Sequence, residues 1–277
     1  MSSRVNRGVG FRTTVAALIT VPFIVPFVFL ISTAVRERSD YVSSPGGLPK
    51  SFTLDHIVES WQEADLGRAL INTLIMCIVA CIVCGTTSLA GGYFFRVARQ
   101  RWTGPLRLLL GAGYAIPMVA WLIPVFVIAA QAGWTGNLFV AGVISGVSSL
   151  PFGFYFVHTF LQQSLSDEVI EATTLDGAGV FRAFFYVGIP MAMPALSAVL
   201  ALTFVWSFGD LLIASTLLQS NTDSYTLTLA ATTLTTREDI NLQGQAAAAL
   251  VSLLPTLIVF AVAQKALKQG FGGGSEK

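Results

Sequence analysis

The chain has 277 residues, of which 54% are hydrophobic and only 11% are charged, and its mean hydropathy is +0.71. Soluble domains carry about 25% charged residues, so this composition excludes an ordinary soluble domain. The formal net charge of +1 provides no broad basic field for nucleic acid. The sequence therefore predicts an all-α membrane protein that has the lipid bilayer, and no nucleic acid, as a partner.

Six apolar windows are long enough to cross a bilayer, since about 20 helical residues span a hydrocarbon core of about 30 Å. Helices satisfy every backbone hydrogen bond inside lipid, and the short alternating segments of a β-barrel do not occur in the sequence. We therefore expect one transmembrane domain over residues 1–277. Its predicted spans are residues 13–35, 69–91, 108–130, 138–160, 195–217 and 246–267.

The distribution of basic residues predicts the orientation of these spans. If both termini are cytoplasmic, eleven of the 16 Lys and Arg residues fall in cytoplasmic segments and five in external ones. Cytoplasmic loops carry the excess of Lys and Arg in membrane proteins. The loop 161–194 then lies on the cytoplasmic side, and the loop Gln219–Gln245 lies outside.

An acidic segment interrupts the apolar sequence in the loop 161–194, after a run without Asp, Glu, Lys or Arg from Leu108 to Ser166. Ser166 is a candidate N-cap, and the acids that follow it suit the first turn of a helix. Gly177 predicts a turn with a left-handed residue. A short apolar helix over 180–186 follows. Composition alone leaves two interpretations open, an amphipathic linker on the membrane and a surface presented to another protein.

The spacing within this loop resembles the EAA loop of bacterial ABC-importer permeases. The family pattern is Glu-Ala-Ala, three residues, Gly, nine residues, then Ile-x-Leu-Pro. Here Glu171-Ala172-Thr173 is followed at the same spacing by Gly177 and by Val187-Gly188-Ile189-Pro190. Phe52-Thr53-Leu54 and Asn72-Thr73 are similar to the maltose-type carbohydrate branch of that family. The resemblance implies the type I ABC importer permease architecture with six transmembrane helices.

The resemblance also implies partners and a division of labour. The chain would be a non-catalytic, multi-pass subunit of the bacterial inner membrane that binds no cofactor itself, with ATP and Mg on separate ATPase subunits. Its partners would be a second homologous permease, a cytoplasmic ABC ATPase dimer and an extracytoplasmic solute-binding protein, which the loop Gln219–Gln245 would reach.

In this family the loop over 165–190 couples the permease to the ATPase. Carried over to this sequence, Glu171 would pair with a basic residue of the ATPase, and Gly177 would permit the sharp turn between the two helices. Leu175 and Phe184 are the candidate docking contacts. The full set of coupling residues is Glu171, Ala172, Leu175, Asp176, Gly177, Phe184 and Pro190.

Asp210 is the one Asp, Glu, Lys or Arg placed well inside a predicted span. A charge in the membrane is costly and is expected to face a cavity or a partner. Trp206 and Thr203 lie four and seven residues earlier, on the same helical face. An aromatic plate beside a hydroxyl and a carboxylate suits a sugar, so these three residues are the candidate substrate pathway. A structural hydrogen bond of Asp210 to a neighbouring helix is the alternative.

Other suggestive residues favour packing. Cys77, Cys81 and Cys84 share one helix face, but their neighbours are Ile, Val and Ala, which predicts packing contacts and no metal site. Gly142 and Gly146 form a small-xxx-small pair that permits close helix contact. His158 lacks a Cys or His neighbour and is expected to be structural.

The sequence thus predicts the permease of an ATP-driven importer for a sugar, oligosaccharide or polyol. Two alternatives remain at this point. One is an ABC permease for another small solute, such as an amino acid or a polyamine. The other is a proton-coupled secondary transporter that uses Asp210 as its carrier.

Overall fold

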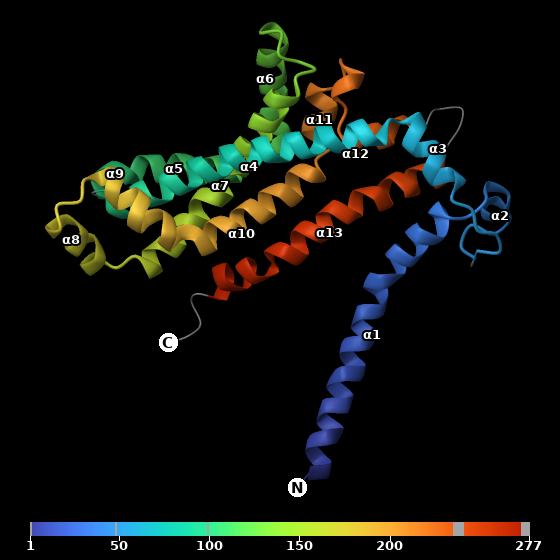
Figure 1. Cartoon of the computed structure of the whole chain (residues 1–277), viewed down its shortest axis with the longest axis horizontal. Coiled ribbons are helices and arrows are strands. Elements are labelled where there is room, and N and C mark those ends of the chain that lie inside the picture. Colours follow the sequence, from blue (N-terminus) through green and yellow to red (C-terminus); the bar gives the residue numbers. More distant parts are fainter. Residues whose placement is uncertain (1, 48, 99, 235–240, 273–277) are drawn as a thin grey trace. The chain divides into compact units, whose positions relative to one another are not determined.

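The structure is a computed structural model that describes the chain except residues 1, 48, 99, 235–240 and 273–277 (Figure 1). Every regular element of the described part is helical. The chain divides into two compact units. The first unit comprises residues 1–67 and 230–253, and the second comprises residues 68–229 and 254–277.

The first unit holds the long N-terminal helix, the segment that follows it and the start of the last helix. Small residues let these parts approach, because Ala34, Ala246 and Ala247 are buried together, with Ile57 packed against them. The helices that contribute to this unit are α1 (Ser2–Ala34), α2 (Arg38–Ser43), α3 (Asp55–Glu63), part of α12 (Leu227–Thr233) and the beginning of α13 (Leu242–Gly272).

The second unit is a bundle in which α4, α7 and α10 run beside one another, with α8 and α9 at one end (Figure 1). A π-helical turn, η1 (Phe184–Gly188), joins α9 to α10, and a 3₁₀ turn, η2 (Thr222–Ser224), precedes α12. Its other helices are α4 (Leu66–Val97), α5 (Gln100–Ala115), α6 (Met118–Gln131), α7 (Leu138–Ser164), α8 (Asp167–Leu175), α9 (Val180–Ala183), α10 (Ile189–Phe208) and α11 (Leu212–Leu217).

Glycines set the distance between α4 and α7. A Cβ added to Gly146 would lie 2.7 Å from the carbonyl oxygen of Ala80, and one added to Gly142 would lie 3.0 Å from that of Met76. Backbone atoms therefore touch where side chains would normally separate two helices. The close helix contact predicted for Gly142 and Gly146 is confirmed.

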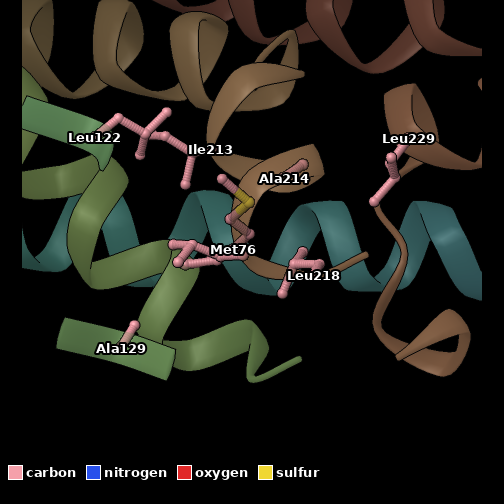
Figure 2. Packing of buried hydrophobic residues seen from close by; sticks show 9 residues of the cluster. Met76, Leu122, Ala129, Ile213, Ala214, Leu218 and Leu229 are labelled. Atoms are coloured by element: carbon pink, nitrogen blue, oxygen red, sulfur yellow. The ribbon is translucent and has the colours of Figure 1, made fainter. Parts of the chain in front are cut away.

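Two apolar clusters hold the second unit together. In the first, Met76 of α4 packs with Ile213 and Ala214 of α11, as Figure 2 shows together with Leu122 and Ala129 of α6. The second lies near α8 and combines residues of α4, α7 and α10: Cys84, Leu89, Tyr93, Val157, Leu161, Leu165, Ala192, Ala195 and Val199. The bundle is thus packed at both of its ends.

The predicted spans agree with the helices in part. Among the described residues, four helices are long and apolar enough to cross a membrane: Leu66–Val97, Leu138–Ser164, Val180–Phe208 and Leu242–Val262. Leu18–Ala34 and Met118–Gln131 are shorter apolar helices. The all-helical membrane fold is confirmed, whereas the number of six crossings stays a prediction.

Two of the expected spans are not single helices. The window 108–130 is interrupted before Pro117, where α5 ends and α6 begins, because a proline lacks the N–H that continues a helix. The window 195–217 is interrupted at Gly209 and Asp210, and its helix begins earlier, since Val180–Phe208 is apolar and helical throughout.

The helix continues through Pro190 because of the π turn. Pro190 cannot donate to the carbonyl of Tyr186, which would be its α-helical partner. Tyr186 lies in the wider turn η1, where the i→i−4 pattern is already changed. The short helix expected over 180–186 is therefore continuous with the fifth expected span.

Segments predicted to lie on the same side of the membrane lie together at each end of the second unit. At one end, Arg68 is paired with Asp223, and the Asn72 side chain donates to the carbonyl of Tyr225 at 3.0 Å. At the other end, Arg96 is paired with Asp167 at 2.7 Å. The segments predicted outside and those predicted inside thus lie at opposite ends of α4.

Candidate functional site

The loop between α7 and α10 forms the predicted helix–turn–helix. Ser166 occupies the N-cap position of α8, and Asp167 and Glu168 lie in its first turn. The Ser166 side chain hydrogen-bonds to the Glu168 carboxylate, which lowers the pKa of that group. Ionised acids at this end of the helix interact favourably with its dipole, so the acidic run stabilises α8 locally.

The turn after α8 depends on Gly177. Its φ of +70° lies in the left-handed region that L side chains rarely adopt, as the sequence predicted. No other atom would lie within 4 Å of a Cβ added there, so the requirement for glycine is conformational. Gly179 precedes α9 with an ordinary φ of −66°.

The outer surface of this loop is apolar and exposed. Leu175 is 88% exposed and Phe181 is 81% exposed, and Val180 and Tyr186 are similarly open. Of the coupling residues expected from the sequence, Glu171, Ala172, Asp176, Gly177 and Pro190 are exposed as well. Among the described residues, no side chain pairs with the Glu171 carboxylate.

Phe184 differs from the rest of that set. It is half-buried, and its ring meets the edge of Tyr93 with 5.2 Å between centroids. It packs against the apolar cluster that also holds Val169 and Ile170 of α8. Phe184 thus anchors the loop to the bundle, while Phe181 takes the outward position.

A second candidate site is a pocket of about 270 Å³ in the bundle of the second unit. Its volume is close to the roughly 300 Å³ at which small-molecule sites begin, so it has room for one ring-sized group. The break before Pro117 and the break at Gly209 both open toward it. Its lining residues are Gly113, Ile116, Met118, Trp121, Ser145, Ser148, Ser149, Pro151, Phe152, Trp206 and Asp210.

The hydroxyl groups of this pocket come from α7. Ser148 donates to the carbonyl of Ser145 at 2.7 Å, and Ser149 donates to the same carbonyl at 3.2 Å. Ser145 and Ser207 share a hydrogen bond of 2.7 Å. Each hydroxyl oxygen keeps lone pairs that can accept from a ligand hydroxyl. These serines were not among the residues predicted from the sequence, although their i, i+3, i+4 spacing within an apolar span was a usable signal.

The aromatic side of the pocket is formed by Trp206 and Phe152. Their rings meet edge-to-face, with 5.0 Å between centroids and 74° between planes. Trp206 is 47% exposed, so part of its ring is accessible to a ligand. Trp206 and Asp210, two of the three residues expected in the substrate pathway, line the same pocket.

Asp210 also has a structural role. It lies in the break between α10 and α11, where its Oδ1 accepts from the backbone N–H of Ile213 at 2.7 Å. The Thr228 hydroxyl donates to the carbonyl of Asp210 at 3.0 Å. The acid therefore caps α11, within a polar break and not within a continuous helix as expected.

Thr203 lies away from the pocket lining. It is fully buried, and its hydroxyl donates to the Cys84 sulfur at 3.4 Å. Cys77 and Cys81 face the carbonyls of Phe204 and Leu200 at 3.8 and 3.5 Å. The cysteine face of α4 is thus in packing contact with α10, as the sequence predicted.

His158 is likewise part of the packing. It is 3% exposed, stacks on Phe154 with 7° between the ring planes, and its Nδ1 lies 3.4 Å from the carbonyl of Gly92. Among the described residues, no group of three or more His, Cys, Asp and Glu side chains could hold a metal ion.

An apolar helical bundle with a partly polar pocket and an exposed helix–turn–helix at one end is typical of the transmembrane domain of a transporter. Residues 86–272 match the family described as binding-protein-dependent transport system inner membrane component. The chain belongs to this family. It is a permease of the ABC importer class and a multi-pass protein of the cell membrane.

Individual proteins resemble the chain over most of its length. It is 26% identical to the melibiose/raffinose/stachyose import permease MelC of Bacillus subtilis, over 96% of this chain and 95% of that one. It is 28% identical to the diacetylchitobiose uptake permease NgcG of Streptomyces coelicolor, over 91% and 83% of the two chains.

A solved structure shares the fold. It is a chain of a bacterial ABC transporter involved in the import of the acidic polysaccharide alginate, with a TM-score of 0.79 and 19% identity, covering 96% of this chain and 98% of that one. Family membership implies a solute-binding protein and an ATPase as partners.

Proposed function

We propose that the chain carries a sugar, oligosaccharide or polyol across the membrane, as one permease subunit beside a second homologous one. It binds no nucleotide itself, and ATP and Mg are held by two cytoplasmic ATPase subunits. The relatives that carry melibiose, raffinose, stachyose or diacetylchitobiose in their names support the carbohydrate class.

The observation that carries the coupling role is the exposed segment 165–190, which contains α8, α9 and η1 and is called the α8–α9 loop below. It presents the Glu171 carboxylate, which pairs with no side chain in the described part of the chain, beside the apolar side chains of Leu175 and Phe181. An apolar centre with a charge at its side is typical of protein–protein contacts. Its inner face is packed on the bundle, so a movement of the docked ATPase reaches the spans. Rigid-body rocking of the subunits then alternates access to the membrane site.

The pocket at Trp206 supports the choice of cargo. A sugar ring can stack its C–H face on the open indole, while its hydroxyls donate to the Ser145, Ser148 and Asp210 oxygens. No Lys or Arg, which a phosphate-like anion would need, is among the described residues that line this pocket. Trp206 and Asp210 are thus the proposed substrate contacts, and Thr203 supports them by fixing α10 against α4.

A polyamine is a second candidate cargo, because the Asp210 carboxylate would also attract an ammonium group. A sugar would use Asp210 as a hydrogen-bond acceptor, whereas a polyamine would use its negative charge. Competition separates them: a sugar should displace labelled cargo from the complex and a polyamine should not, and the reverse result would transfer the proposal to the polyamine.

The coupling role is tested in liposomes that contain the permeases, the ATPase and the loaded binding protein. Glu171→Lys should abolish ATP-dependent uptake while the chain stays in the membrane. Gly177→Val should do the same, because a side chain in the left-handed region costs about 1–2 kcal/mol and alters the turn. Gly179→Ala is the matched control, since its ordinary φ accepts a Cβ. Normal uptake by both loop variants would exclude the coupling role.

A further inference from the structure

The last two turns of α4 contact both ends of the α8–α9 loop. Arg96 lies beside the residues where α7 ends and α8 begins, and Tyr93 lies beside the π turn that follows α9. The two residues are three apart and therefore share one face of α4. Among the described side chains of the bundle, no other pair on one helix face hydrogen-bonds to, or stacks on, both ends of this loop.

The Arg96 side chain holds the start of the loop through a backbone carbonyl of the loop. Its Nε and Nη2 donate to the carbonyl oxygen of Leu165 at 2.9 and 2.5 Å, and Nη2 also donates to Asp167 Oδ1 at 2.7 Å. Leu165 is the C-cap of α7 and is 1% exposed. The last carbonyls of a helix have no partner within it, and a charged donor forms a stronger hydrogen bond than a neutral one.

Tyr93 holds the end of the loop by close packing of its ring. Its ring meets Phe184, the first residue of the π turn, and lies against Gly188, the last. A Cβ added to Gly188 would lie only 2.6 Å from the ring carbon Cδ2 of Tyr93. Tyr93 is 7% exposed, so its ring has little room to move aside. Closely packed contacts of this kind transmit displacement instead of absorbing it.

We propose that Tyr93 and Arg96 are positioning residues that pass a displacement of the α8–α9 loop to α4 and hence to the bundle. Arg96 couples the start of the loop, and Tyr93 couples its end through η1. This inference rests on the proposed function, in which the loop docks on the ATPase. It assigns the transmission of movement to the C-terminal end of α4, and this role is separate from the docking of the loop on the ATPase.

The test measures solute transported per ATP hydrolysed by the full complex in liposomes, together with the amount of ATPase that co-purifies. Arg96→Gln should leave co-purification unchanged and lower the transport ratio by about 2- to 30-fold, the range that changes in coupling networks produce. Asp167→Asn is the control. Its carboxylate is 81% exposed, so this ion pair should matter less than about 2-fold.

A second pair of variants tests Tyr93 independently. Gly188→Ala should lower the transport ratio because the new methyl group displaces the Tyr93 ring. In the Tyr93→Ala background the same change should have no further effect, because the ring is gone, and this non-additivity is specific to the contact.

The outcomes separate this inference from the proposed function. If the wild-type complex takes up solute without ATP, or binds no ATPase, the proposed function fails. If the wild type couples normally, and Arg96→Gln and Gly188→Ala both keep its transport ratio, α4 does not transmit the movement. If the variants lose the ATPase instead, the residues support docking, and the proposal is again wrong.

Discussion

Asp210 shows how one side chain can serve both structure and transport. Its Oδ1 caps α11 through the N–H of Ile213, and its backbone carbonyl binds Thr228, so part of the cost of a polar group in the membrane is met locally. The residue still lines the pocket with Trp206. The two interpretations that the sequence left open for Asp210 are therefore compatible.

Two substitutions at Asp210 distinguish these roles. Asn keeps a side-chain oxygen for the cap, so Asp210→Asn should retain stability but weaken uptake through a raised KM. Asp210→Ala should in addition lower the free energy of unfolding by about 1 kcal/mol, the usual cost of a lost cap. Thermal unfolding in detergent and uptake kinetics measure both effects. Equal stability of the two variants would contradict the capping role, and an unchanged KM in both would remove Asp210 from the substrate pathway.

At the scale of elements, the segment around α2 is held by a buried ion pair. Arg36 is 1% exposed and donates to the Asp40 carboxylate at 2.9 Å and to the carbonyls of Gly47 and Ser44 at 3.1 and 3.0 Å. Asp40 also accepts from the backbone N–H of Lys50 at 2.8 Å. This ion pair thus links α2 to the carbonyls of Ser44 and Gly47 and to the backbone N–H of Lys50.

This pair predicts a pH dependence. The hydrogen bond from Arg36 lowers the pKa of Asp40 well below its ordinary value of about 3.9. A lowered pKa stabilises the folded segment at neutral pH, and this stabilisation is lost as the pH falls below about 4. Hydrogen exchange at the Lys50 and Ser51 amides, corrected for its intrinsic pH dependence, should therefore accelerate in acid relative to α4.

Two variants check the cause of that dependence. Asp40→Asn should exchange rapidly at these amides at every pH, since the charged acceptor is gone. Asp55→Asn, at an exposed position of the neighbouring α3, should behave as the wild type. A pH response that persists in Asp40→Asn would assign it to another group.

At the scale of the whole molecule, the charge pattern predicts how the chain is oriented in the membrane. The second unit places the segments predicted on the two sides at opposite ends of α4. The breaks at Pro117 and Gly209 lie along the pocket, where interrupted helices are tolerated because they line a cavity. The same bundle thus combines the apolar helices, the pocket and the proposed coupling loop.

Reporter fusions test the orientation. A fluorescent protein at the C-terminus should fold and fluoresce, because that end is predicted to be cytoplasmic, and alkaline phosphatase there should be inactive. Phosphatase fused after Gly136, in a turn predicted to lie outside, should be active and serves as the matched control. Activity at the C-terminus and none at Gly136 would reverse the predicted topology.

Much of this protein follows from its sequence alone. Apolar length determines helices that span a membrane, since lipid offers the backbone no partner. The left-handed turn at Gly177 and the N-cap position of Ser166 are equally local, because they depend on the conformational preferences of single residues. The spacing from Glu171 to Pro190 was sufficient to indicate the family that residues 86–272 match.

Only the tertiary structure decided which side chains meet. Sequence spacing placed Thr203 on one face with Trp206 and Asp210, but α4 covers Thr203 and the serines of α7 take its place in the pocket. The family resemblance made Phe184 a candidate docking contact, whereas Tyr93 of α4 holds it against the bundle. Helical periodicity tells which residues of one helix share a face, but what that face contacts depends on helices distant in the chain.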